Sequence, residues 1–103
     1  MRKVVAVCVA SGCLFFVGTA FADADLVRKS NCMACHAADQ KRFGPSWKEV
    51  AAKYNGDSAA AVMLAKKIQT GGTGVWGQAP MPPQAQVSDA DAKTLAEYIL
   101  STK

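Results

Sequence analysis

The six residues NCMACH, from Asn31 to His36, contain two cysteines separated by two residues and a histidine directly after the second cysteine. Two cysteines at this spacing are compatible with a redox-active dithiol, with part of a zinc site, or with covalent attachment of a prosthetic group. The composition of the rest of the chain helps to separate these chemistries. His36 is the only histidine in the 103 residues, so any site that needs two imidazoles is excluded.

The chain begins with a segment typical of a secretory signal peptide. Two basic residues precede an uncharged run from Val4 to Ala22, and this run ends in a small-x-small cleavage pattern. We therefore expect cleavage after Ala22, which removes residues 1–22 and leaves one domain, residues 23–103. A retained membrane anchor is one alternative, and lipoprotein processing at Cys13 is another.

The expected mature chain of 81 residues is small and only mildly basic. Its ten Lys and Arg side chains exceed the eight Asp and Glu side chains by two, too few for the strongly basic face of a nucleic-acid-binding protein. A domain of this size buries little more than about 60% of its unfolded surface, so it often needs a bound group or a staple. One disulfide between the two remaining cysteines would close a very short loop and stabilise the fold weakly.

The pattern along the mature chain predicts short helices and no strands, and therefore an all-α fold. Ser46 and Glu49 have the form of a capping box, Asp57 or Ser58 is expected to cap the next helix, and Ser88 opens the last one. The predicted helices span residues 24–30, 46–54, 58–70 and 88–103. The positions expected to face the core are Ala61, Leu64, Ala65 and Ile68 in the third helix and Leu95, Tyr98 and Ile99 in the fourth.

A long stretch rich in glycine and proline separates the last two predicted helices. Residues 71–87 read GGTGVWGQAPMPPQAQV, and these residue types disfavour regular structure. Structureless segments of this length are uncommon in small domains and are often functional. We therefore expect part of the functional site here.

The three chemistries open to the cysteine pair make different demands. A structural zinc site normally has four Cys or His ligands, and the mature chain offers only three, so Asp23, Asp39 or water would have to complete it. A thioredoxin-like pair follows a strand, and no strand is predicted. C-x-x-C-H is the recognised signature of covalent haem attachment, in which two thiols reach the porphyrin edge and the next imidazole becomes the proximal ligand. We therefore expect haem c bound through Cys32 and Cys35, with His36 on the iron.

The second axial position is open to methionine, lysine, water or no ligand at all. Met33 lies between the two anchoring cysteines, on the proximal side, and Met63 lies beside the apolar face of the third predicted helix, where it suits a core position. Met81 lies between Pro80 and Pro82, which restrict the backbone and could hold the sulfur in one place. We expect Met81 to be the ligand.

Four motifs, in this order, resemble the small bacterial class I cytochromes c. They are CMACH, FGPSWKEVAAKY, GVWGQAPMPP and the terminal AEYILSTK. The chain is most similar to the periplasmic monohaem cytochrome c-551/c-552 type, also called cytochrome c8, over residues 24–103. The resemblance implies a class I cytochrome c fold, with about four short helices around one covalently bound haem, and His36 and Met81 as its axial ligands.

The same resemblance implies roles for residues around the haem. The carbonyl of Pro45 would accept a hydrogen bond from His36 Nδ1 and so orient the ligand ring. Trp76 would hydrogen-bond a haem propionate, and Lys67 stands where some relatives carry a propionate-contacting arginine. Gln84 stands where relatives often have an asparagine near the methionine sulfur.

With histidine and methionine both on the iron, no position is open to a substrate, so we expect an electron carrier and not an enzyme. The resemblance suggests a monomeric periplasmic shuttle without nucleic-acid or membrane contacts. It would link a quinol-oxidising complex or another donor to nitrite reductase, a terminal oxidase or cytochrome c peroxidase. The alternatives are a haem-based small-ligand sensor or enzyme subunit with a displaceable Met81, and a thiol oxidoreductase that uses Cys32 and Cys35.

Redox partners of such a carrier dock briefly and over small interfaces. Basic side chains could steer the encounter, although surface lysines are usually only solvated. The candidates for a steering patch are Lys41, Arg42, Lys48, Lys66 and Lys67.

Overall fold

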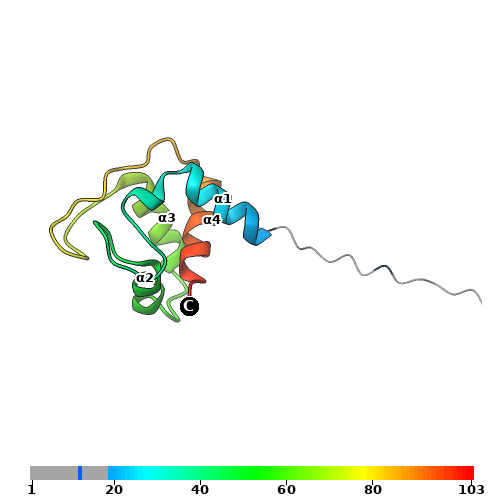
Figure 1. Cartoon of the computed structure of the whole chain (residues 1–103), viewed down its shortest axis with the longest axis horizontal. Helices are drawn as coiled ribbons and strands as arrows, with labels where there is room; N and C mark the ends of the chain where they lie inside the picture. The colour runs from blue at the N-terminus through cyan, green and yellow to red at the C-terminus, as the bar shows by residue number, and fades with distance from the viewer. Residues whose placement is uncertain (1–11, 13–18) are drawn as a thin grey trace, which may run out of the picture.

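The structure is a computed structural model that describes residue 12 and residues 19–103. Within these residues it contains four α-helices and one 3-10 turn, and no β-strand (Figure 1). The elements are α1 (Thr19–Lys29), η1 (Cys32–Ala34), α2 (Trp47–Lys53), α3 (Ala60–Thr70) and α4 (Asp89–Leu100). The predicted all-α fold is confirmed.

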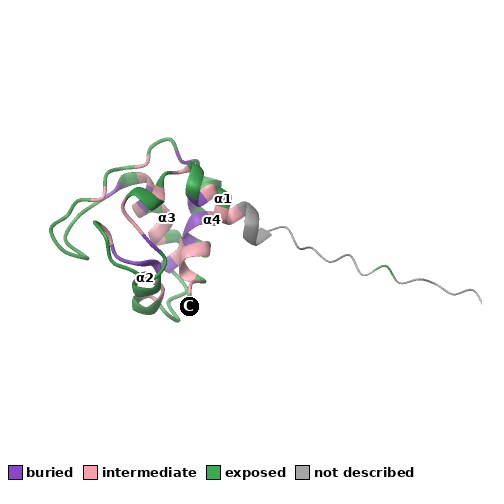
Figure 2. Ribbon diagram, in the orientation of Figure 1, coloured by how far each residue is buried: buried purple, intermediate pink, exposed green. Residues whose placement is uncertain are grey.

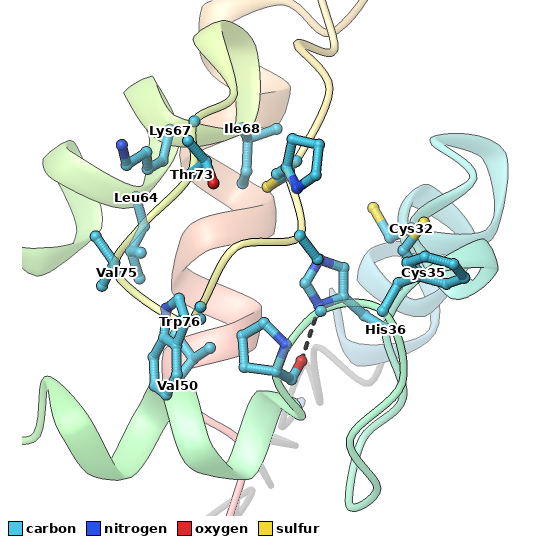
Figure 3. A pocket seen from close by; sticks show the side chains of 18 of the residues that line it. Cys32, Cys35, His36, Val50, Leu64, Lys67, Ile68, Thr73, Val75 and Trp76 are labelled. Carbon is cyan, nitrogen blue, oxygen red and sulfur yellow. Dashed lines mark hydrogen bonds between the residues drawn. The ribbon is translucent and has the colours of Figure 1, made fainter.

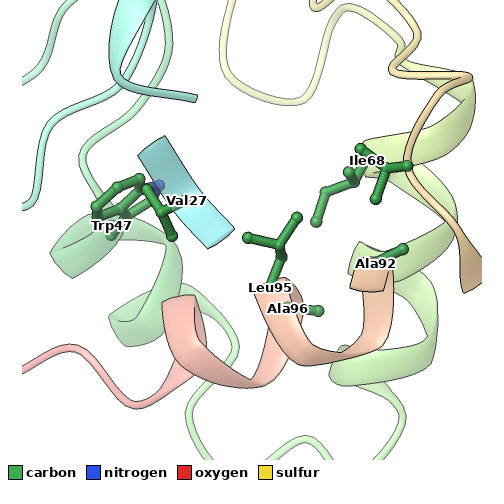
Figure 4. Close-up of a cluster of buried hydrophobic side chains, with 7 residues drawn as sticks. Val27, Trp47, Ile68, Ala92, Leu95 and Ala96 are labelled. Carbon is green, nitrogen blue, oxygen red and sulfur yellow. The ribbon is translucent and has the colours of Figure 1, made fainter. Parts of the chain in front are cut away.

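Helix α4 is the centre of the fold, because it packs against each of the other three α-helices. Leu95 of α4 is completely buried and lies between Ile68 of α3 and Val27 of α1 (Figure 4). The small side chains of Ala92 and Ala96 are also completely buried, which lets the neighbouring helices approach α4 closely. The core of the domain is therefore one apolar cluster around the middle of α4.

Helix α2 begins where the capping box predicts. The Ser46 hydroxyl accepts a hydrogen bond from the Glu49 N–H at 3.1 Å, and the Glu49 carboxylate accepts one from the Ser46 N–H at 2.8 Å. The helix buries Trp47 and Val50. The Trp47 ring meets Tyr98 of α4 nearly edge-on, with 6.2 Å between the ring centroids, a favourable geometry for two aromatic rings. The cap thus fixes α2 in the orientation that brings its aromatic residue onto α4.

Helix α3 begins later than the sequence predicts, and the expected cap is wrong. Its N-cap is Ala59, which makes no side-chain hydrogen bond. The Asp57 carboxylate accepts a hydrogen bond from the Ala59 N–H at 2.9 Å, and the Asp57 carbonyl accepts one from the Ala60 N–H at 3.2 Å. Aspartate therefore closes a local turn here instead of capping the helix, a competition that is common for short polar side chains.

Helix α1 is longer than predicted, because it starts at Thr19 rather than near Ala24. This stretch contains no glycine or proline that would stop a helix before the expected cleavage site. Most of the expected signal peptide, residues 1–11 and 13–18, lies outside the described residues, so cleavage after Ala22 stays a prediction. None of the helices in the described part of the chain is both long and apolar enough to cross a membrane.

Helix α4 is shorter than predicted and ends at Leu100. The hydroxyls of Ser101 and Thr102 both donate to the Tyr98 carbonyl, at 2.6 and 3.4 Å. Side chains that bond the backbone in this way compete with continuation of a helix, which accounts for the early end.

The apolar face predicted for α3 is largely confirmed. Ile68 is buried, and Leu64 and Ala65 pack against the core cluster. The expectation that Met63 fills the core is wrong: it is half-buried and lines a surface groove together with Val62. The reason is that α3 turns only the stripe containing Leu64 and Ile68 toward α4.

The segment between α3 and α4, residues 71–87, is mostly exposed, but Gly71 and Val87 near its ends are buried (Figure 2). The Gln69 side chain donates to the Val87 carbonyl at 3.1 Å. The backbone N–H of Gln84 donates to the Ile68 carbonyl at 3.0 Å. Both hydrogen bonds tie the C-terminal end of this long loop back to the end of α3, where the loop begins.

Replacing Leu95 with alanine should lower the free energy of unfolding by about 3 kcal/mol, because the cavity left between the helices cannot fully collapse. Denaturant unfolding of the purified protein measures the loss. Val62→Ala is the matched control, since Val62 is 73% exposed on α3 and should change stability by less than about 0.5 kcal/mol. Equal costs at the two positions would contradict the central place of α4.

Ser46→Ala should cost about 1 kcal/mol, because it removes the acceptor for the Glu49 N–H at the start of α2. Thermal unfolding monitored by far-UV circular dichroism provides the comparison. Ser58→Ala changes an exposed serine that does not cap α3, and its melting temperature should stay that of wild type. A similar shift for both variants would argue against the capping box.

Candidate cofactor site

The segment from Asn31 to His36 forms one tight turn. Asn31 adopts the left-handed conformation, with φ 59° and ψ 25°, and leads the chain from α1 into η1. The Cys32 carbonyl accepts hydrogen bonds from the N–H groups of Cys35 and His36, at 3.2 and 3.0 Å. Residues three and four positions apart share one face of a helical turn. The two thiols and the imidazole therefore lie together, as Figure 3 shows.

This face forms one wall of a cavity built by six segments: the turn itself, the loop before α2, the three helices α2, α3 and α4, and the loop between α3 and α4. Leu64, Lys67 and Ile68 of α3 lie across the cavity from the cysteines (Figure 3). Apart from Gln84, the structure brings all of the site residues expected from the sequence to this one cavity. They are Cys32, Cys35, His36, Pro45, Lys67, Trp76 and Met81.

Two neighbours hold the His36 ring. Its Nδ1 lies 2.8 Å from the carbonyl oxygen of Pro45 (dashed line in Figure 3). A carbonyl can only accept, so Nδ1 carries the proton and Nε2 keeps a free lone pair. On the other side, a Cβ at Gly44 would lie only 2.3 Å from His36 Cε1. The ring is therefore held in one orientation, with Nε2 available as a metal ligand.

The backbone of the loop before α2 places these neighbours. The Gly44 N–H donates to the Cys35 carbonyl at 2.9 Å, and the Trp47 N–H donates to the Ala37 carbonyl at 3.0 Å. Pro45, between these two attachments, is buried. The orientation of the imidazole thus depends on main-chain geometry and on a glycine. Sequence reasoning missed Gly44, although it stands directly before the proline that was singled out.

The two cysteines do not have the character of a reactive dithiol. Both thiols are free and partly buried, and burial raises the pKa of the Cys32 thiol. Reactive cysteines need a lowered pKa, because the thiolate is the nucleophile. This finding disfavours the redox-pair alternative.

The zinc alternative is disfavoured by the absence of a ligand cluster. Nowhere in residues 19–103 do three Cys, His, Asp or Glu side chains form a group that could hold a metal ion. Of the sulfur and nitrogen donors of this cavity, the two thiols and the imidazole lie in the turn, and the Met81 thioether lies in the loop after α3.

Met81 lies at the base of an excursion of the long loop, residues 72–81, which we call the 72–81 hairpin. The N–H of Gly72 donates to the Met81 carbonyl at 3.0 Å, and the N–H of Met81 donates to the Gly72 carbonyl at 2.8 Å. Gly71 has φ 67°, and a Cβ there would lie 2.3 Å from the Met81 carbonyl oxygen. The close approach of two backbone segments thus ties Met81 to the end of α3.

Among the described residues, Met81 is the methionine that lines this cavity. Met33 is 41% exposed between the two cysteines, and Met63 lies in the groove on α3. Gln84 does not reach the cavity either, since its side chain donates to the Pro82 carbonyl at 3.3 Å.

The remaining lining is mostly apolar and fits a large flat group. Val50, Tyr54 and Val75 also line the cavity. The sequence did not assign them to the site, because a hydrophobic pattern indicates that a side chain is buried but not whether it packs against the core or against a cofactor. Trp76 is 37% exposed. An apolar cavity with two thiols, an imidazole nitrogen and a thioether has the donors that a covalently attached, axially ligated haem requires.

Comparisons with known proteins point to the same group. The family Cytochrome c matches residues 22–103. Cytochrome c-552 of Nitrosomonas europaea is 54% identical over 94 residues, which cover 91% of this chain and 91% of that protein. Cytochrome c-551 of Azotobacter vinelandii is 54% identical over 79 residues, which cover 77% of this chain and 95% of that protein.

A solved structure shows the same fold. The crystal structure of wild-type Nitrosomonas europaea cytochrome c552 aligns with a TM-score of 0.76 at 56% identity, covering 78% of this chain and 99% of that one. The class I cytochrome c fold and the expected resemblance to the c-551/c-552 type are therefore confirmed, and one covalently attached haem c is the cofactor. The chain belongs to the cytochrome c family and is an electron carrier of that family.

Proposed function

We propose that this protein is a periplasmic single-electron shuttle whose haem c is attached through Cys32 and Cys35 and ligated by His36 and Met81. One observation carries the proposal: an oriented imidazole and a thioether line the same apolar cavity as the two thiols. Haem c supplies reversible one-electron chemistry. The chain supplies the ligands, their orientation and an apolar surrounding.

The two axial side chains determine what the site can do. If His36 and Met81 both held the haem iron, no ligand position would be left for a substrate, which favours electron transfer over catalysis. A thioether ligand raises the reduction potential, and so does exclusion of water by the apolar walls. The Pro45 carbonyl keeps Nε2 of His36 directed as a ligand. The backbone pairing of Gly72 with Met81 would limit movement of the sulfur when the haem changes oxidation state.

Two further residues are proposed to bind the haem propionates. Lys67 and Trp76 line the cavity on the side away from the cysteines (Figure 3). The Trp76 indole N–H is a donor, and the Lys67 ammonium is a point charge that can neutralise a carboxylate. A Cβ at Gly72 would lie 2.5 Å from Lys67 Nζ, so glycine leaves the lysine the room it occupies.

The cellular setting completes the proposal. Cleavage after Ala22 would release residues 23–103 into the periplasm as a monomer. Family resemblance suggests a quinol-oxidising complex or another respiratory donor, and nitrite reductase, a terminal oxidase or cytochrome c peroxidase as the acceptor. Docking would be brief and guided by exposed basic side chains. The exposed members of the candidate steering patch are Lys41, Arg42, Lys48 and Lys66.

The ligand assignment is tested by the visible spectrum and reduction potential of the exported holoprotein. Ferric wild type should show the weak long-wavelength band of methionine–iron ligation. Met81→Ala should lose it and fall in potential by roughly 0.1 V or more, because axial ligands set haem potentials over a wide range. Met33→Ala is the control, since Met33 lies outside the cavity, and it should behave as wild type.

Two other outcomes of this test would contradict the proposal. A wild-type protein with covalent haem but without the methionine band would contradict the ligand set and favour a small-ligand sensor or an enzyme subunit. Isolation of the protein with two titratable thiols and no haem would contradict the attachment itself.

Gly44→Ala tests the support of the proximal ligand. The added methyl group would meet the His36 ring, so the ring must turn away from the Pro45 carbonyl. The visible spectrum of the holoprotein should change, and the NMR signals of the His36 ring should shift. Gly56→Ala is the control: a Cβ there meets nothing, but φ is +79°, so it should cost about 1 kcal/mol of stability without a spectral change. Identical spectra for the two variants would refute the role given to Gly44.

A further inference from the structure

We propose that Lys53, the last residue of α2, is a positioning residue. It holds the exposed tip of the 72–81 hairpin against α2 through a cation–π contact with Trp76, and thereby limits how often Met81 leaves the iron. The part that concerns Met81 rests on the proposed function, since it takes Met81 to be a ligand.

The contact joins two segments that are distant in sequence. Lys53 Nζ lies 5.5 Å from the centroid of the Trp76 ring and 5.8 Å from the centroid of the Tyr54 ring. Both distances fall within the range of a cation–π interaction. Tyr54 is the C-cap residue of α2, whereas Trp76 belongs to the hairpin. The ammonium therefore bridges the end of a core helix and the loop.

The hairpin has few other attachments at its tip. The Thr73 hydroxyl donates to the Gln78 carbonyl at 3.1 Å, and the Gly74 N–H donates to the Gly77 carbonyl at 2.9 Å. In the described part of the chain, no hydrogen bond links residues 73–80 to another segment. The backbone pairing holds the base of the hairpin, and the lysine contact holds its tip.

The charge of Lys53 is available for this contact. Glu49, one helical turn earlier, directs its carboxylate to the Ser46 N–H at 2.8 Å. Within residues 19–103, the ion pairs join Asp25 to Arg28 and Lys93 to Glu97, so Lys53 is not in one of them. The capping box thus uses the carboxylate that could otherwise pair with Lys53 at i,i+4 spacing.

The contact between Lys53 and Trp76 should also affect Met81, because Trp76 lies close to Met81 in the chain. Trp76 and Met81 both line the cavity and belong to the same hairpin. Gly74 and Gly77, on either side of Trp76, have φ of 100° and 123°, in the region that favours glycine. Loss of the lysine contact should let this tip move and open the cavity beside Met81.

The experiment compares Lys53→Gln, Lys53→Arg and Lys48→Gln as holoproteins. The rate of cyanide binding to the ferric protein reports how often the methionine position opens. Lys53→Gln should bind cyanide roughly two- to fivefold faster, which is the size expected for an exposed cation–π contact. Lys53→Arg should restore the wild-type rate, because guanidinium also stacks on aromatic rings. Lys48→Gln removes an exposed lysine of the same helix that makes no aromatic contact, and it should leave the rate of cyanide binding at its wild-type value.

A second readout does not depend on the iron ligand. In the NMR spectrum of the ferrous protein, ring currents should shift the Lys53 Hε protons upfield, and Trp76→Leu should remove part of this shift. Absence of a change in Trp76→Leu would overturn the contact. A cyanide rate in Lys53→Gln equal to that of wild type, with the methionine band present, would overturn the effect on Met81. Absence of that band in wild type would instead refute the proposed function and the claim about Met81, while the Hε shift would still decide whether Lys53 holds Trp76.

Discussion

The hydrogen bond between His36 Nδ1 and the Pro45 carbonyl is the interaction on which the cavity depends. It joins the turn that carries the two cysteines to the loop that leads into α2, and it determines which ring nitrogen is free to bind a metal. The Pro45 carbonyl stays in place because both of its neighbours in sequence are fixed. The Gly44 N–H donates a hydrogen bond to the Cys35 carbonyl, and Ser46 forms the capping box of α2. A single main-chain acceptor thus links the local conformation of two segments to the chemistry of the site.

The apolar core and the cavity are not separate parts of this small domain. Ile68 belongs to the buried cluster around α4 and also lines the cavity, as do the partly buried Leu64 and Ile99. The same side chains therefore contribute to the apolar core on one side and to the lining of the cavity on the other. In a chain of this size the cofactor supplies apolar contacts that the polypeptide alone cannot provide. Stability and cofactor binding should consequently be strongly coupled.

The parts of the site that could be predicted are those whose geometry follows from short spacing. Cys32, Cys35 and His36 are close in sequence and share one turn, so their arrangement follows from the motif. Gly44 and Lys53 could not be predicted in this way. The role of Gly44 depends on the His36 ring that packs against its backbone, and the role of Lys53 depends on the Trp76 ring beneath its ammonium group. Both contacts join segments that are separate in sequence, and a sequence pattern gives no distance between such segments. The expectation that Asp57 caps a helix failed for a different, local reason: a turn and a helix cap use the same residue types.

The two proposed axial ligands are held by different kinds of interaction, and this difference determines which side of the site should open first. His36 is held by a backbone carbonyl and by the absence of a side chain at Gly44, and neither can adjust by changing a rotamer. Met81 is held by one pair of backbone hydrogen bonds at the base of a glycine-rich hairpin, and its side chain, which packs against the core cluster, is only partly buried. Local opening occurs first where few buried contacts and exposed hydrogen bonds hold a segment. The methionine side is therefore where this site should open first, and a contact at the hairpin tip can tune that opening without disturbing the histidine side.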